Sequence, residues 1–175
     1  MRIRLPLFEY IFVFGLCLAL CFLLPQCVKK PDIPSSAPDF TLKTVHGQEI
    51  ILSSLKGKVI LLDFWATWCG PCKESIPHLI HLYRNYRDKG FELIGMSMDK
   101  ADQIELVRRF IGSMEIPYPV IITPEEVAKN YKVTGFPTTI LIDRQGKVRE
   151  KIIGFNNGIA KQLVAKVEEL TSEKP

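Results

Sequence analysis

Two cysteines separated by two residues are the side chains of this sequence best suited to do chemistry. They lie in the segment WCGPC at residues 68–72, between an apolar run and a stretch with helical spacing. A cysteine at a helix N-terminus has a lowered thiol pKa, because unpaired backbone N–H groups and the helix dipole stabilise the thiolate. Cys72 lies one turn further on, within reach of a disulfide. The spacing therefore predicts a redox dithiol in which Cys69 attacks and Cys72 resolves.

A structural disulfide and half of a zinc site are the alternatives for these cysteines. Zinc usually needs two more ligands at recognisable spacing, and the sequence contains no second CxxC or HxxxH pair. His78 and His81 share a predicted helix face, but exposed or packed histidines are commoner than ligands. We therefore expect no metal site and no cofactor other than the redox-active disulfide between Cys69 and Cys72.

The elements that must position the cysteines alternate between strand and helix patterns. Residues 58–65 form a β-rich apolar run typical of a central strand, and residues 71–89 follow as a helix with Gly90 as its C-cap. Thr123 is expected to be the N-cap of a helix over 124–131, with Pro124 at its first position. The other expected elements are hairpins over 40–42 with 50–52 and 138–142 with 148–153, strands over 91–98 and 118–122, and helices over 102–113 and 156–171. This order predicts an α/β fold with a mixed sheet and helices on both faces.

Composition and charge narrow the classes of protein. The chain has 175 residues, of which 47% are hydrophobic and 24% charged, and its net charge is +4. This supplies a core for one domain and excludes disorder, collagen and repeat arrays. The basic residues are scattered rather than gathered in a stripe, so we expect no nucleic acid partner.

The N-terminus has the pattern of an export or membrane segment. Arg2 and Arg4 precede an unbroken apolar run over 11–24. No good small-x-small cleavage site lies between residues 20 and 35, so we favour an uncleaved membrane anchor, with a cleaved signal or lipidation at Cys27 as alternatives. We divide the chain into a signal or anchor over 1–27, a linker over 28–36 rich in Pro, Ser and Lys, and a globular domain over 37–175.

Two segments resemble thioredoxins. Residues 63–73, DFWATWCGPCK, are similar to the thioredoxin active-site segment, and GFPTT at 135–139 resembles the segment whose proline is cis and packs against the disulfide. The resemblance implies a cis bond before Pro137, which would leave neighbouring backbone free to pair with an extended substrate. We expect the substrate surface to include Trp68, Gly70, Pro71 and Phe136.

The rest of the chain resembles one branch of this superfamily. The export segment, the APDF sequence at 37–40 and the added helix and strand between Asp99 and Thr123 are similar to the membrane-tethered TlpA/ResA-like thiol-disulfide oxidoreductases of bacteria. The resemblance spans residues 37 to about 170. It implies a thioredoxin-like fold with an N-terminal β-hairpin and a helix-strand insertion. It also implies a domain on the periplasmic or extracytoplasmic side, supplied with electrons by a membrane carrier of the DsbD or CcdA kind.

One position matches thioredoxins and another departs from the branch. Asp63 matches the buried aspartate of thioredoxins, for which the resemblance implies proton exchange with the resolving thiol of Cys72. Burial in a central strand is expected to raise its pKa, although a strand-end carboxylate held by hydrogen bonds is the alternative. Ser75 stands where relatives devoted to cytochrome c maturation often have glutamate, which weakens the prediction of that role.

We therefore predict an extracytoplasmic enzyme that reduces protein disulfides through a mixed disulfide with Cys69. The Gly-Pro pair between the cysteines matches thioredoxin and favours a reductant over an oxidant. A peroxiredoxin-like peroxidase is one alternative, although such enzymes have no CxxC beside the peroxidatic cysteine. A Sco-like copper-delivery module is another, although its cysteines are spaced CxxxC and no histidine follows His81 here.

Overall fold

The structure is a computed structural model that describes residues 34–173. The predicted signal or anchor over 1–27 and the first part of the predicted linker, 28–33, lie outside the described residues. Within 34–173, no helix combines the length and the apolar character needed to cross a bilayer.

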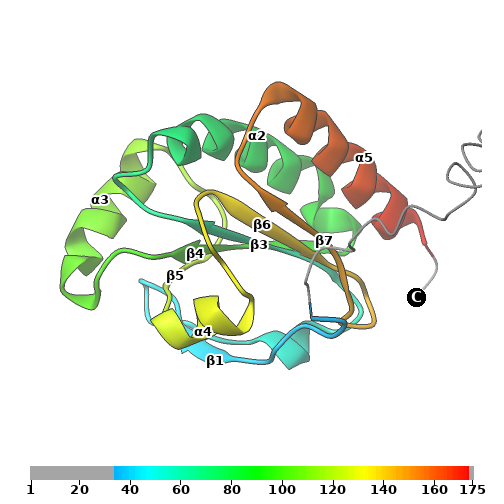
Figure 1. Ribbon diagram of the computed structural model, residues 1–175, viewed down its shortest axis with the longest axis horizontal. Coiled ribbons are helices and arrows are strands. Elements are labelled where there is room, and N and C mark those ends of the chain that lie inside the picture. The colour runs from blue at the N-terminus through cyan, green and yellow to red at the C-terminus, as the bar shows by residue number, and fades with distance from the viewer. Residues whose placement is uncertain (1–33, 174–175) are drawn as a thin grey trace, which may run out of the picture. The chain divides into compact units, whose positions relative to one another are not determined.

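A mixed sheet of five strands forms the centre of the protein, in the order β5-β4-β3-β6-β7 (Figure 1). Strand β3 (Val59–Trp65) lies in the middle and is buried at every position, as its apolar sequence predicts. It runs parallel to β4 (Phe91–Ser97) and antiparallel to β6 (Thr138–Ile142). Strands β5 (Val120–Ile122) and β7 (Val148–Ile153) form the edges.

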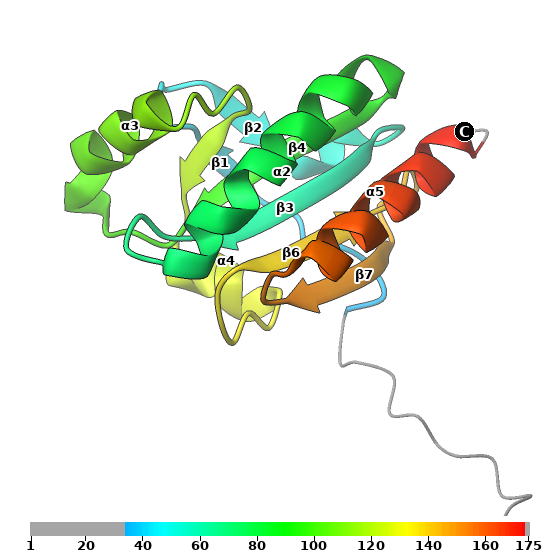
Figure 2. The ribbon, with the colours of Figure 1, turned by 90° about the horizontal axis from the view of Figure 1, so that it is seen from above.

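Helices cover both faces of this sheet. Helices α2 (Gly70–Tyr86) and α5 (Asn157–Ser172) lie side by side on one face, and Figure 2 shows them in front of the strands. Helix α3 (Ile104–Ser113) packs into the same core cluster. Helix α4 (Glu125–Asn130) and an N-terminal hairpin lie below the sheet in Figure 1. The thioredoxin-like α/β fold is therefore confirmed.

The two predicted additions to this fold are present. Strands β1 (Thr41–Lys43) and β2 (Glu49–Ile51) pair antiparallel as a small separate sheet, followed by the 3₁₀ turn η1 (Leu52–Leu55). The insertion consists of the 3₁₀ turn η3 (Ala101–Gln103), then α3, and then β5, which pairs parallel with β4. The insertion thus extends the sheet by one edge strand.

Two helix boundaries test the capping predictions. Helix α2 ends at Tyr86, and after the 3₁₀ turn η2 (Arg87–Lys89) Gly90 adopts a left-handed φ of 78°, as its C-cap prediction requires. The prediction that Thr123 caps α4 is wrong. Pro124 is the N-cap, with an extended ψ of 142°. Thr123 instead continues the sheet, because its N–H donates to the Ser97 carbonyl at 2.7 Å.

Gly95 in β4 lies where neighbouring side chains leave little room for a Cβ atom. A Cβ atom at this position would lie 3.0 Å from both Trp65 Nε1 and Val120 Cγ2, all within the buried core. We expect Gly95→Ala to lower the free energy of unfolding by about 1–3 kcal/mol, because the core has no room for a methyl group. Gly112→Ala is the matched control: its Cβ would meet nothing within 4 Å, and alanine stabilises a helix by up to ~1 kcal/mol. Urea unfolding of the oxidised protein measures both, and equal midpoints would contradict the close packing.

Candidate active site

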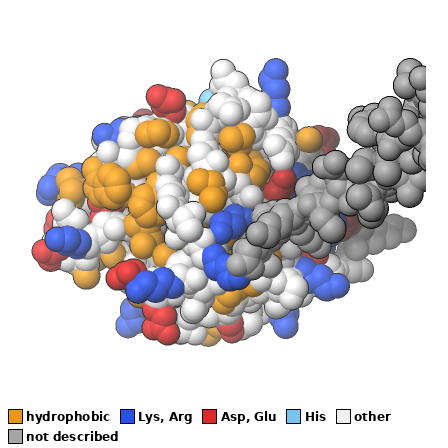
Figure 3. Space-filling view, in the orientation of Figure 1, with side chains coloured by type: hydrophobic (Ala, Val, Ile, Leu, Met, Phe, Trp, Pro, Cys, Tyr) orange, Lys and Arg blue, Asp and Glu red, His pale blue; other side chains and the backbone are white. Residues whose placement is uncertain are grey.

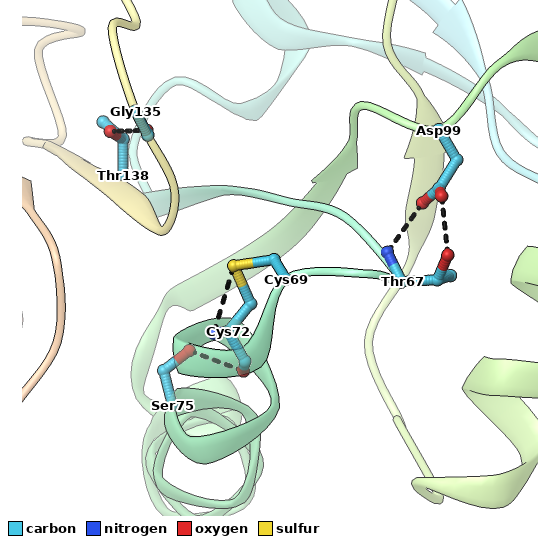
Figure 4. The surroundings of a disulfide bond; sticks show 7 residues. All are labelled: Thr67, Cys69, Cys72, Ser75, Asp99, Gly135 and Thr138. Atoms are coloured by element: carbon cyan, nitrogen blue, oxygen red, sulfur yellow. Dashed lines mark hydrogen bonds between the residues drawn. A yellow bond between two sulfur atoms is a disulfide. The ribbon is translucent and has the colours of Figure 1, made fainter.

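The cysteine pair forms a disulfide at the junction of β3 and α2 (Figure 4). Cys69 is the N-cap of α2, and its Sγ accepts a hydrogen bond from the Cys72 N–H at 3.3 Å. After reduction the same N–H group and the helix N-terminus are placed to stabilise a thiolate on Cys69. Pro71 occupies the first turn, where its missing N–H costs no helical hydrogen bond.

The two sulfur atoms differ in access. Cys72 is fully buried, whereas Cys69 keeps a small exposed fraction of 6%. The neighbouring Trp68 is the most exposed large hydrophobic residue described, at 67%. Figure 3 shows hydrophobic side chains gathered over α3 and the first turns of α2. Cys69 is therefore the more exposed cysteine of the pair, and the roles of attacking and resolving cysteine stay a prediction.

The predicted cis proline is also present. The Phe136–Pro137 peptide bond is cis, and the Phe136 ring meets the Trp68 ring edge-on at 5.9 Å between centroids. The Pro137 carbonyl accepts from the Gly154 N–H at 2.7 Å, and the Gly135 carbonyl accepts from the Thr138 hydroxyl at 2.6 Å. Phe136, which lies between them, makes no backbone hydrogen bond to another residue within 34–173. We call Trp68, Phe136 and the half-exposed Ile153 the aromatic rim.

Asp63 lies inside the protein, behind the disulfide. It projects from β3 on the same face as Leu61 and Trp65, which pack with Cys72 in one core cluster. Its side chain is fully buried, and neither carboxyl oxygen has a hydrogen-bond partner within residues 34–173. Burial raises the pKa of Asp63 to about 7. The pKa is thus raised as predicted, and the alternative of a carboxylate held by hydrogen bonds is not what the structure shows.

One positioning residue was missed by the sequence analysis. Asp99 follows β4 and accepts three hydrogen bonds, from the Thr67 N–H at 2.9 Å, the Thr67 hydroxyl at 2.6 Å and the Ser97 hydroxyl at 2.8 Å. Figure 4 shows this carboxylate holding the loop that leads to Cys69. A signal was available, because parallel strands end at the same edge of a sheet and Asp99 follows the strand next to β3.

The remaining residues considered for chemistry pack locally. The His78 ring lies 5.2 Å from the Phe155 ring, and His81 Nε2 bonds Asn85 at 2.8 Å. Ser75 is buried, and its hydroxyl donates to the Cys72 carbonyl at 2.9 Å. Across residues 34–173, no group of three or more His, Cys, Asp or Glu side chains is gathered as a metal site would require.

Comparison with known proteins assigns the family. The Redoxin family model matches residues 34–168. The chain belongs to the Redoxin family. This Redoxin-family protein is 39% identical over 154 residues to a thiol-disulfide oxidoreductase ResA of Bacillus cereus, covering 85% of this chain and 87% of the relative. It is 37% identical over 153 residues to the ResA of Bacillus thuringiensis subsp. konkukian, with the same coverage of 85% and 87%.

A solved structure agrees with these relatives. A crystal structure from Chlorobium tepidum, named as a candidate thiol:disulfide interchange protein DsbE, matches with a TM-score of 0.74 and 32% identity. The match covers 82% of this chain and 100% of that structure. The Redoxin-family protein is therefore a thiol-disulfide oxidoreductase of the ResA/DsbE type, with Cys69 and Cys72 as its CxxC pair.

The raised pKa of Asp63 predicts that stability falls as pH rises. The unfolded chain releases this proton near pH 3.8, whereas the folded protein holds it to about pH 7. Between these values the folded state binds more protons, so raising the pH favours unfolding. At ~1.4 kcal/mol for each pKa unit, Asp63 lowers the free energy of unfolding by up to about 4 kcal/mol across this window.

Asp63→Asn should remove this slope when urea unfolding of the oxidised protein is followed from about pH 4 to about pH 8. Asp102→Asn, at an exposed position in η3, is the control and should keep it. A wild-type slope in Asp63→Asn would mean that the buried carboxyl titrates near its ordinary pKa.

Proposed function

We propose that this thiol-disulfide oxidoreductase reduces disulfides of protein substrates on the extracytoplasmic side of a membrane. The observation that carries the proposal is the difference between the two sulfurs: Cys69 borders the surface at a helix N-terminus, and Cys72 is fully buried behind it. The disulfide between them is itself the redox group, and the mechanism calls on no other cofactor. Electrons reach the substrate only through thiol chemistry.

The reaction proceeds in two exchanges. In the reduced protein the Cys69 thiolate attacks a substrate disulfide, forming a mixed disulfide and releasing one substrate thiolate. Cys72 then gives its proton to the Asp63 carboxylate, and its thiolate attacks Cys69 Sγ. The bond to the substrate breaks, the second substrate sulfur leaves as a thiolate, and the disulfide between Cys69 and Cys72 forms. Asp63 serves as the base because its raised pKa, about 7, lies close to a working pH.

The aromatic rim is the surface we propose for the substrate chain. Trp68, which directly precedes Cys69, and Ile153, whose Cγ2 lies 3.7 Å from the Cβ position of Gly135, are exposed apolar side chains. The backbone of Phe136 makes no hydrogen bond to another residue within 34–173, so it is available to an extended peptide that docks beside the cis proline. Gly70 and Pro71 are exposed and directly follow Cys69 in the chain, so we include them in the surface for the substrate. Such a surface suits unfolded or extended segments of many sequences.

The proposals for the location of the protein and for its electron supply rest on the sequence. A basic N-terminus followed by the apolar run over 11–24 supports membrane tethering. A reductase outside the cytoplasm must be recharged across the membrane, so we propose a membrane electron donor of the DsbD or CcdA type. Cytochrome c maturation is a finer prediction about the substrate, and the buried Ser75 supplies no carboxylate beside Cys72 to support it.

Reduction potential and trapping together test the proposal. We expect the full chain, equilibrated against thiol buffers, to have a potential near that of thioredoxin, about −270 mV. A value near about −120 mV, typical of DsbA, would make the protein a disulfide donor and overturn the reductase direction.

Trapping tests the assignment of the two cysteines. Cys72→Ala should accumulate mixed disulfides with protein substrates in membranes of the producing cell, because the resolving thiol is gone. Cys69→Ala is the matched control and should trap none. Equal trapping by both variants, measured on non-reducing gels, would contradict the roles.

A further inference from the structure

The mechanism above leaves one buried titratable group unused. Tyr118 lies in the loop between α3 and β5, is only 4% exposed, and its hydroxyl has no hydrogen-bond partner within residues 34–173. Its ring covers Gly95, since Tyr118 Cε2 would lie 3.3 Å from a Cβ atom there. Gly95 is the register partner of Asp63 on the neighbouring strand. Tyr118 therefore occupies the space beside the buried carboxyl that a larger side chain at residue 95 would fill.

Other neutral donors gather around the same carboxyl. Trp65 Nε1 lies 3.0 Å from the Cβ position of Gly95, and Thr139 is the register partner of Asp63 on β6. Both polar atoms are buried without a hydrogen-bond partner in the described part of the chain. Buried polar groups in native proteins are almost always satisfied, directly or through ordered water. No hydrogen bond joins these donors to Asp63 in the structure, and both oxygens of its carboxyl are likewise buried without a partner, so three donors and an unsatisfied acceptor lie close together.

The groups facing Asp63 include no cation in the described residues. Burial first, and then the charge of Asp63, raise the pKa of Tyr118 well above its usual value, so the phenol stays neutral and donates. The elements packed on this face present apolar side chains and few titratable groups. The titratable groups are Cys72 and Tyr83 from α2 and Tyr118 from the loop before β5, and the polar neutral group is Thr139 from β6. The apolar side chains include Val107 and Ile111 from α3 and Leu163 and Val167 from α5.

Tyr118 also reaches a cavity that is separate from the aromatic rim. This cavity of about 750 Å³ is bordered by Tyr118, Tyr83 and Glu92 and by the β1–β2 hairpin, and none of the rim residues borders it. The Tyr83 ring meets the Tyr118 ring edge-on at 5.8 Å, and Glu92 at the cavity binds Lys58 Nζ at 3.0 Å. Tyr118 thus borders this cavity as well as Gly95, and its hydroxyl itself is buried.

We propose that Tyr118 is a positioning residue whose hydroxyl turns to donate a hydrogen bond to Asp63 when that carboxyl is charged, and that it connects Asp63 to this cavity for proton exchange. The proposal deepens the proposed function. When Cys72 resolves the mixed disulfide, its proton moves to Asp63, and a substrate docked on the aromatic rim blocks the route past Cys69. The proton then leaves Asp63 for the Tyr118 oxygen while the phenol proton passes to water in the cavity. Tyr118 stays neutral throughout this relay, Asp63 is again a carboxylate, and the disulfide between Cys69 and Cys72 can then be reduced by the electron donor.

Tyr118→Phe in the full chain tests this connection, because it removes one hydroxyl and keeps the ring over Gly95. Loss of a donor to the anion should raise the pKa of Asp63 by about one unit or more. The infrared carboxyl band of Asp63, isolated by subtracting the spectrum of Asp63→Asn, reports this shift in the oxidised protein without any turnover. The single-turnover reduction of insulin, followed by tryptophan fluorescence, should slow by about tenfold near pH 7 and shift its pH profile upward.

Tyr131→Phe is the matched control. Tyr131 is a buried tyrosine on the opposite core, and its hydroxyl donates to the Pro38 carbonyl at 2.7 Å. Its removal costs stability and should leave both the Asp63 titration and the insulin profile as in the wild type. An unchanged carboxyl titration in Tyr118→Phe would overturn the proposal. Failure of the wild type to reduce insulin would count against the reductase function alone, because the infrared titration does not depend on it.

Discussion

The junction between a fully buried central strand and the N-terminus of a long helix is the constraint on which the rest of this structure depends. Strand β3 is buried at every position. The chain leaves the sheet at the carboxyl end of this strand, and α2 begins a few residues later. This places Cys69 where unpaired N–H groups meet the surface and Cys72 one turn deeper in the core. In the proposed mechanism, the activation of Cys69, its accessibility and the order of the two exchanges all depend on that placement.

Holding this junction in one geometry requires polar contacts from distant parts of the chain. The Asp99 carboxylate fixes Thr67 through both its backbone and its hydroxyl. From the other side, the cis bond at Pro137 brings Phe136 against Trp68. Asp99 follows β4 and Phe136 precedes β6, the two strands paired with β3, so the sheet register positions the loop as well as the core. A loop fixed in this way presents Cys69 to a substrate without a large rearrangement.

The buried carboxyl of Asp63 lowers the stability of the folded protein. Asp63 lies among apolar side chains with no cation beside it in the described residues, so its charged form is disfavoured and the protein loses stability as the pH rises. The same desolvation brings its pKa to the range where a base can accept a thiol proton and release it again. The loss of stability therefore has the same cause, burial, as the raised pKa on which the proposed proton transfer depends.

The sequence by itself determined the features that depend on neighbouring residues. The apolar run of β3, the helical spacing of α2, the left-handed Gly90 and the CxxC pair are local, so propensity and spacing predicted them. The prediction of Thr123 as the N-cap of α4 was wrong, although capping is a local feature. The Thr123 N–H bonds the Ser97 carbonyl beside the sheet, and this contact outweighed the capping propensity of threonine. Only the tertiary structure revealed the Asp99–Thr67 contact and the placement of Tyr118 over Gly95 beside Asp63. Such contacts depend on strand order and register, which join residues far apart in the chain, and no local pattern encodes them.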